Sequence, residues 1–203
     1  MALRTDFLPG YFAAQFDEHL AVAAETRRGL AGDFARLVEI GARAIEAGGK
    51  LLFFGNGGSA ADAQHVATEF VVRLKRERGP LPALALTTDG PTLTAIGNDY
   101  GFDRVFERQI EAHGRAGDVA IGLSTSGRSR NVLLGLARAR ERGLIAAGFG
   151  GGDGGQMAGL ADPLLLVPSF ATARIQEMHH LLGHALCGAI EIALGVLPLE
   201  PAS

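Results

Sequence analysis

The sequence predicts an α/β fold: a five-stranded parallel sheet flanked by helices in a flavodoxin-like, three-layer arrangement, with extra helices at the N-terminus. Two observations carry this prediction. Five short apolar runs recur along the 203 residues, and segments with apolar residues at helical spacing lie between them. Strands that alternate with helices form parallel sheets through right-handed crossovers.

The elements follow from the chain in order. Residues from about 11 to 47 carry apolar side chains at helical spacing and are expected to form two helices. Further helices are expected after the first, second, third and fifth strands. The predicted strands are 50–55, 83–87, 119–123, 144–149 and 164–167, and the predicted later helices are 59–78, 91–113, 129–142 and 174–194.

The organisation expected is a single domain over residues 1–203. Residues 1–48 would be the N-terminal helices used for oligomerisation, and residues 49–203 the ligand-binding α/β core. The final helix is apolar on much of its surface, and with the N-terminal pair it offers more apolar surface than a small domain buries. We therefore expect a homo-oligomer, and specifically a homotetramer.

Composition excludes several classes of protein. The net charge of −3 leaves no basic surface for nucleic acid, and the basic residues between 73 and 78 are interpreted as a solvated helix end. Cys187 has no partner for a disulfide and is expected to be a buried thiol rather than a nucleophile. No apolar run is long enough to span a membrane or act as a signal peptide, so we expect a cytoplasmic protein.

Two loops at strand ends have unusual composition. The first, Gly55-Asn56-Gly57-Gly58-Ser59, lets the backbone approach a ligand and leads into a helix N-terminus, although a plain tight turn is the alternative. It lacks the lysine of a P-loop and the spacing of a dinucleotide fingerprint. The second, from Ser124 to Ser129, places four hydroxyls before a helix, which is more than capping requires. Hydroxyls and helix amides together predict a phosphate site.

A metal site is the third possibility. His65 and Glu69 are spaced i, i+4 on the helix after the glycine loop, and Gln176, His180 and His184 repeat the same step on the last helix. Such a set could bind zinc, although spacing alone slightly favours a simple surface pair for His65 and Glu69. His19 and His113 lack such neighbours and are expected to be solvated.

These residues lie within motifs that resemble the phosphosugar-binding SIS domain family. The motifs are GNGGSAADAQH at 55–65, LTAIGNDYGF at 93–102, STSGRS at 124–129, GGQMAGLAD at 154–162 and RIQEMHHLLGH at 174–184. Within that family they are most similar to the sedoheptulose 7-phosphate (phosphoheptose) isomerases. The resemblance covers nearly the whole chain, and it implies a SIS-type fold and conversion of sedoheptulose 7-phosphate to D-glycero-D-manno-heptose 7-phosphate.

The resemblance also implies a role for individual residues. Glu69 and His184 match the residues proposed to move protons. A zinc ion would be held by His65, Glu69, Gln176 and His184. Substrate contacts would come from Asn56, Gly57, Gly58, Ser59, Glu69, Asn98, Asp99, Ser124, Thr125, Ser126, Ser129 and Gln176.

Some positions depart from the family pattern. Arg128 stands where asparagine is common, Ala173 where some relatives have an acidic residue, and His180 where histidine is unusual. Gln176 and His184 lie about 12 Å apart along an ideal helix, so spacing alone would pair His180 with His184. His180 is therefore the alternative ligand to Gln176.

Two other functions are compatible with the resemblance. One is a non-catalytic binding module of the type that associates with the replication initiator DnaA, in which the positions of Glu69 and His184 are not Glu and His. The other is a sugar-phosphate sensor, which usually accompanies a DNA-binding module. The presence of both Glu69 and His184 favours an enzyme.

Overall fold

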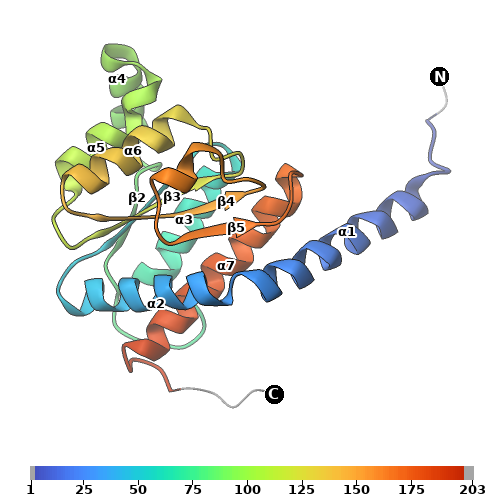
Figure 1. Ribbon diagram of the computed structural model, residues 1–203, viewed down its shortest axis with the longest axis horizontal. Helices are drawn as coiled ribbons and strands as arrows, with labels where there is room; N and C mark the ends of the chain where they lie inside the picture. The colour runs from blue at the N-terminus through green and yellow to red at the C-terminus, as the bar shows by residue number, and fades with distance from the viewer. Residues whose placement is uncertain (1–2, 199–203) are drawn as a thin grey trace.

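The computed structural model describes residues 3–198 and contains the predicted five-stranded sheet (Figure 1). All strands are parallel, in the order β2-β1-β3-β4-β5. The strands are β1 (Leu51–Gly55), β2 (Ala83–Ala85), β3 (Val119–Ser124), β4 (Ile145–Gly151) and β5 (Leu164–Val167). The α-helices are α1 (Leu8–Gly29), α2 (Ala31–Glu46), α3 (Gly58–Val71), α4 (Gly90–Tyr100), α5 (Val105–His113), α6 (Arg130–Glu141) and α7 (Thr172–Ala193).

The sheet lies between two layers of helices, which confirms the predicted three-layer fold. One apolar core joins α2, α3 and α7 to one face of the sheet, around Phe53, Phe70 and Phe149. A second core joins α4, α5 and α6 to the other face, around Phe54 and Phe106. Every residue of β1 and β3 is buried because helices cover both faces, as is usual for parallel sheets.

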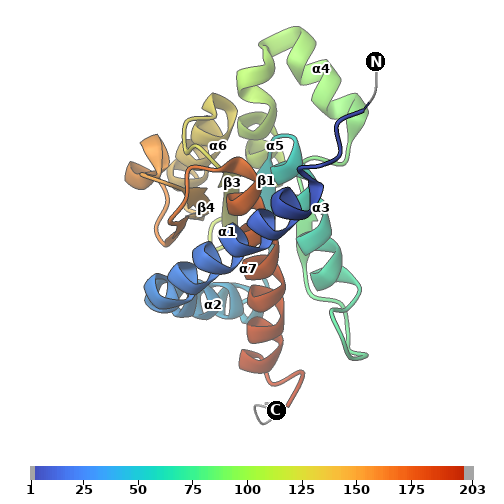
Figure 2. The same ribbon diagram turned by 90° about the vertical axis from the view of Figure 1, so that its right-hand side faces the viewer.

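Helix α1 extends away from these layers (Figures 1 and 2). Its attachment to α7 is polar: the buried Arg174 guanidinium donates to the Gln15 carbonyl, and His19 Nδ1 lies 2.7 Å from a carboxylate oxygen of Glu177. Large apolar side chains remain exposed along the helix and at the residue before it, namely Phe7, Leu8, Tyr11, Phe12, Phe16 and Leu20. Within residues 3–198, no helix has the length and apolar character needed to span a bilayer.

Two of the predicted helices are longer than the helices in the structure. Residues 91–113 form two helices, because Gly101 adopts φ +88° between α4 and a short 3₁₀ turn that precedes α5. The helix expected to reach residue 78 ends at Val71, and the chain then turns back. Strand β2 is also shorter than predicted, because only Ala83–Ala85 pairs with β1.

Arg78 explains how α3 can end where it does. Its guanidinium donates to the carbonyl oxygens of Glu69 and Phe70, which α3 leaves without helical partners, and to that of Gly79 further along the chain. It also pairs with Glu191 of α7 at 2.7 Å. The side chains of Arg78 and Glu191 are only 2% and 1% exposed. The interpretation of residues 73–78 as a solvated helix end is therefore wrong for Arg78, which fixes the end of α3 against α7.

Candidate functional site

The two unusual loops meet at the C-terminal edge of the sheet, because β1 and β3 are neighbours. Asn56, in the loop after β1, and Asn131, at the start of α6, exchange two amide hydrogen bonds of 2.8 Å. Asn131 is buried, and its Oδ1 also accepts the backbone N–H of Val132. This pair ties the glycine loop to the hydroxyl loop, so that both can face a single ligand.

The hydroxyl loop, residues 124–129, connects β3 to α6. Ser124 ends β3, is buried, and donates to the Ser129 hydroxyl at 3.1 Å. Thr125 is half-buried, and Ser126 is exposed, with its hydroxyl accepting the Arg128 N–H. Gly127 has φ +62°, and a side chain there would collide with the backbone of Gly154. The glycine therefore allows the hydroxyl loop to press against the loop after β4.

Arg128 links the hydroxyl loop to the loop after β4. One of its guanidinium nitrogens lies 2.7 Å from a carboxylate oxygen of Asp153, which also accepts the Gly155 N–H. The bonds from Arg128 and Gly155 lower the pKa of the Asp153 carboxyl below its usual range. In the structure, Arg128 therefore holds the hydroxyl loop next to the loop that contains Asp153.

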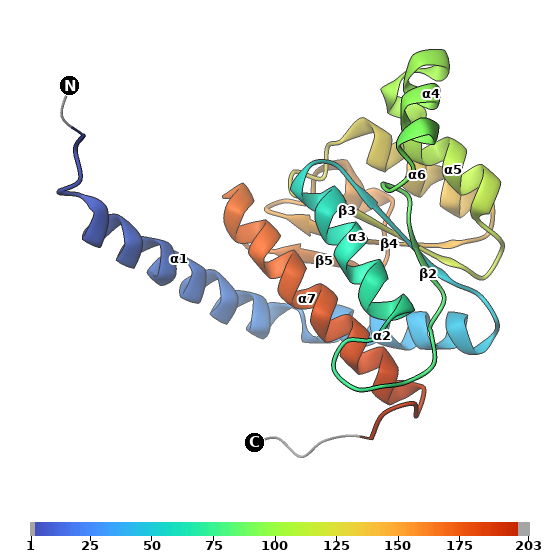
Figure 3. The same ribbon diagram turned by 180° about the vertical axis from the view of Figure 1, so that it is seen from behind.

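Helices α3 and α7 pack side by side on one face of the sheet (Figure 3). Each starts at the C-terminal edge of the sheet, so they run in the same direction. On α3 the polar side chains facing α7 are Asp62, His65 and Glu69, at i, i+3 and i+7. On α7 the facing side chains are Gln176, His180 and His184, at steps of four.

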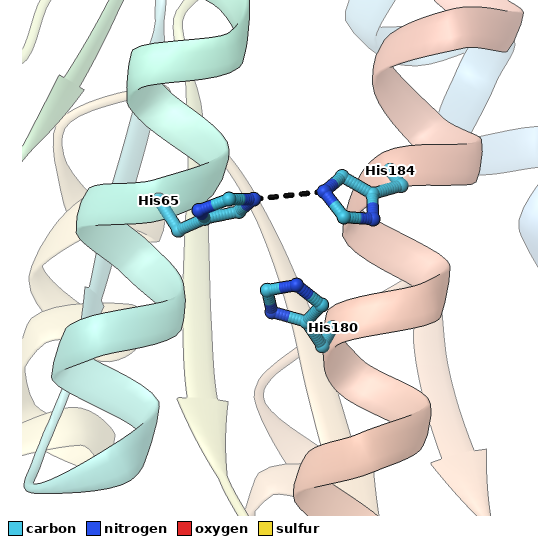
Figure 4. Close-up of side chains that lie close together, drawn as sticks. All are labelled: His65, His180 and His184. Carbon is cyan, nitrogen blue, oxygen red and sulfur yellow. Dashed lines mark hydrogen bonds between the residues drawn. The ribbon is translucent and has the colours of Figure 1, made fainter. Parts of the chain in front are cut away.

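Three imidazoles meet between these helices (Figure 4). The Nε2 atoms of His65 and His184 lie 2.8 Å apart, and the ring centroid of His180 lies 4.5 Å from that of His65 and 4.6 Å from that of His184. One nitrogen from each ring belongs to a set whose members all lie within 4.8 Å of one another. Among the described residues, this is the group of His, Cys, Asp and Glu side chains that could hold a metal ion.

The geometry of this group fits a divalent ion. Imidazole nitrogens bound tetrahedrally to zinc at 2.0–2.1 Å lie about 3.3 Å from one another. The three rings need to shift only slightly from the arrangement in Figure 4 to reach that spacing. Desolvation, together with the neighbouring His180 and His65, lowers the pKa of His184. A lowered pKa favours the neutral ring, which is the form that binds metals.

Carboxylates lie on two sides of the imidazole group. Glu69 Oε1 is 3.4 Å from His65 Nε2, and this carboxylate also lines a hollow together with His184. Asp62 Oδ1 lies 3.1 Å from Nδ1 of His180. The site thus combines a candidate metal centre with a carboxylate that could act as a base.

Gln176 lies at the other end of the row on α7. Its amide occupies the space beside Gly58, where any Cβ would collide with it. Gly58 precedes His65 by seven residues, which is about 10 Å along a helix. The residues Gly58, Gln176, His180 and His184 line one groove of about 610 Å³. A ligand in this groove would extend from the glycine loop to the imidazoles.

The remaining predicted residues lie elsewhere. Ser59 is buried and packs against Gly55. Asn98 and Asp99 are exposed on α4, where their side chains contact each other at 2.8 Å, and α4 lies on the opposite side of the sheet from α7 (Figures 1 and 3). The structure therefore does not bring this pair to the imidazoles within one chain. Burial raises the pKa of the Cys187 thiol to about 12, in keeping with an inert buried cysteine.

Sequence reasoning missed three residues near the site. His19, expected to be solvated, pairs with Glu177 and lines the same groove as His180. The sequence around His19 gave no indication of this contact, because Glu177 lies 158 residues further along the chain. Asn131 could not be linked to Asn56 for the same reason. Asp62 did carry a signal, since it precedes His65 by three residues on the same helix face.

Comparison with known proteins places the chain among close relatives. Residues 14–151 match the model of the SIS domain. The chain is 60% identical over 177 residues to the phosphoheptose isomerase of Paramagnetospirillum magneticum. The aligned region covers 87% of this chain and 92% of that protein. The structure of phosphoheptose isomerase GmhA from Neisseria gonorrhoeae superposes with a TM-score of 0.85 at 46% identity, covering 91% of this chain and 98% of that one. A phosphoheptose isomerase from Francisella tularensis gives a TM-score of 0.86 at 35% identity, covering 89% and 96%.

Proposed function

Because the chain belongs to the SIS domain family, and within it to the phosphoheptose isomerases, we propose that it converts sedoheptulose 7-phosphate to D-glycero-D-manno-heptose 7-phosphate in heptose biosynthesis. The enzyme class follows from the family: the protein is a sugar-phosphate isomerase. One observation supports the location of the active site between α3 and α7. The predicted proton-transfer residues, Glu69 and His184, border a single hollow beside an imidazole group that could bind a metal.

The reaction moves a proton between the two carbons at the end of the sugar. Glu69 takes the proton α to the carbonyl and returns it to the neighbouring carbon, through an enediol. His184 serves as the complementary acid and base at the oxygens, and its lowered pKa keeps a neutral ring available near pH 7. When bound, zinc supplies a Lewis acid that polarises the substrate oxygens. The resemblance assigns that ion to His65, Glu69, Gln176 and His184, with His180 as the alternative to Gln176.

The other end of the substrate would bind at the sheet edge. Ser124, Thr125, Ser126 and Ser129 hold the phosphate, and Asn56, Gly57 and Gly58 contact the sugar hydroxyls. Asn98 and Asp99 would reach a substrate from a second subunit, because α4 lies across the sheet from α7. Binding energy from the phosphate then positions the reacting carbons.

Loss of a single phosphate contact should affect substrate binding more than chemistry. We expect Ser126→Ala to raise KM for sedoheptulose 7-phosphate several-fold and to leave kcat nearly unchanged, because the phosphate is held alike in the ground and transition states. Ser126 is exposed and its hydroxyl accepts only a local N–H, so the change should not disturb the fold. Steady-state kinetics would decide, and a lower kcat at unchanged KM would contradict this role.

Direct assay tests the function. The full chain is incubated with sedoheptulose 7-phosphate, with and without a metal chelator, and aldose formation is followed. We expect turnover that the chelator abolishes and that added Zn²⁺ restores. Binding of the sugar phosphate without turnover would instead support the sensor, or the non-catalytic module of the DnaA-associating type. Turnover that the chelator leaves unchanged would refute the metal-assisted mechanism while retaining the isomerase.

We also propose that the N-terminal helices assemble a homotetramer, in a protein that works in the cytoplasm. The exposed side chains of Phe12 and Phe16 contact each other along α1, with ring centroids 4.9 Å apart, and other large apolar side chains continue this face. Light scattering should report a tetramer at micromolar concentration, and the double variant Phe12→Glu/Phe16→Glu should reduce it to smaller species. A monomeric wild-type protein would contradict the proposal.

A further inference from the structure

We propose that His19 of α1 is a further substrate-binding residue, which Glu177 holds so that its ring can accept a hydrogen bond from a hydroxyl group of the sugar chain. The inference rests on the proposed function, because it takes the groove beside Gln176 and His180 as the place where the sugar chain lies. It adds α1 to the two helices, α3 and α7, on which other predicted site residues lie.

The His19 ring is held in place by the first turns of α7. Nδ1 of His19 lies 2.7 Å from one carboxylate oxygen of Glu177, and the other oxygen accepts from Arg174 at 2.6 Å. The Arg174 side chain is only 7% exposed, and it also donates to the backbone carbonyl of Gln15 on α1. Because a buried guanidinium fixes the Glu177 carboxylate, that carboxylate can orient the imidazole.

The contact with Glu177 also decides which nitrogen of the ring is free. An ionised carboxylate only accepts hydrogen bonds, so Nδ1 of His19 carries the proton. In the neutral ring Nε2 then keeps its lone pair. Among the described residues, the hydrogen bonding of His19 is confined to Glu177, and 38% of its side chain is exposed. A hydroxyl group of a ligand can therefore donate to Nε2.

The groove is bordered by three helices. Its lining includes Gly58 and Asp62 from α3, Gln176 and His180 from α7, and His19 from α1. Its volume of about 610 Å³ is in the usual range for small-molecule sites, in which a few polar groups fix the orientation of the ligand. A sugar chain carries a hydroxyl group on almost every carbon, and each group that loses water needs a new partner. Polar side chains from three helices therefore suit such a chain.

The alternative is that His19 only attaches α1 to α7. Arg174 already binds α1 through the carbonyl of Gln15 and lies 3.7 Å from a carboxylate oxygen of Glu18, so the attachment does not depend on His19 alone. The two roles also use different atoms. Attachment needs only Nδ1, whereas a contact with the substrate needs Nε2. A substitution that keeps one nitrogen and removes the other therefore separates them.

Binding of two probes to the full-length protein tests the inference without turnover. One probe is the alditol phosphate made by reducing the carbonyl of sedoheptulose 7-phosphate, which keeps the hydroxyl chain but cannot isomerise. The other probe is inorganic phosphate, and calorimetry measures both dissociation constants.

His19→Asn is the decisive variant, because its amide can donate to Glu177 in place of Nδ1 but has no atom in place of Nε2. We expect it to weaken binding of the alditol phosphate about 3–10-fold, the effect of one lost hydrogen bond, and to leave binding of inorganic phosphate unchanged. His19→Ala should weaken binding of the alditol phosphate at least as much. Glu18→Ala is the matched control, since it removes a second contact between α1 and Arg174 from outside the groove and should leave both probes bound as in wild type.

Other outcomes would overturn the inference. If His19→Asn binds the alditol phosphate as tightly as wild type does, His19 only attaches α1. An equal loss of inorganic phosphate binding, an equal loss in Glu18→Ala, or no binding of the alditol phosphate by the wild type would also refute the contact. If His19→Ala fails to fold, as judged by circular dichroism, His19→Asn decides alone.

The proposed function fails separately. A protein that binds the alditol phosphate through His19 but forms no aldose from sedoheptulose 7-phosphate would retain this contact and lose the reaction. A protein that forms the aldose, and whose His19→Asn variant binds the alditol phosphate like wild type, would retain the reaction and lose this contact.

Discussion

Replacing Glu69 by glutamine is expected to lower kcat for aldose formation from sedoheptulose 7-phosphate by about 10²–10⁴-fold, the usual effect of losing a general base. Glutamine keeps the shape and hydrogen-bonding capacity of the side chain but cannot accept a proton at neutral pH. Glu69 lies on α3 with its carboxylate toward His65, and its backbone carbonyl is held by Arg78. The fold and the binding of sugar phosphate should therefore survive the change.

Two comparisons make this prediction specific. Glu77→Gln removes a carboxylate that is 90% exposed beyond the end of α3, and it should leave kcat unchanged. A joint loss of metal binding and turnover in Glu69→Gln would indicate that Glu69 is a ligand as well as a base. If Glu69→Gln turns over within about threefold of wild type, Glu69 is neither base nor essential ligand.

Much of the fold could be predicted because its signals are local. Each strand is a short apolar run followed by a turn, and alternation with helices requires a parallel sheet. The errors occurred where distant residues decide the structure. Residues 72–78 continue no helix because Arg78 folds back onto the end of α3 and pairs with Glu191, which lies 113 residues further along the chain. Nothing in the local sequence distinguishes this arginine from its solvated neighbours.

For the candidate site, the sequence could indicate only which side chains share one face of a helix. Spacing within a helix put His65 with Glu69, and His180 with His184, on common faces. Spacing could not say which turn of α7 lies opposite which turn of α3. In the structure Gln176 lies beside Gly58, whereas His180 and His184 lie beside His65.

The end of α3 offers the largest expected effect on stability. Replacing Arg78 by methionine should lower the free energy of unfolding by about 3–5 kcal/mol, because Glu191 would be left as an unpaired charge in a nearly fully buried place. The carbonyl oxygen of Glu69 would also lose the donor that Arg78 supplies, and that of Phe70 would keep only the Leu81 N–H. Urea unfolding followed by circular dichroism at one fixed protein concentration measures the loss.

A second substitution separates the charge from the packing. In Arg78→Met/Glu191→Leu, the unpaired carboxylate is gone and apolar side chains fill its place, so much of the lost stability should return. Arg43→Met, which removes an exposed i, i+4 pair with Glu39, should have little effect. If Arg78→Met unfolds within about 1 kcal/mol of wild type, the pair does not hold α3 to α7. If the double variant recovers stability but not turnover, the guanidinium is also needed to fix the backbone that carries Glu69.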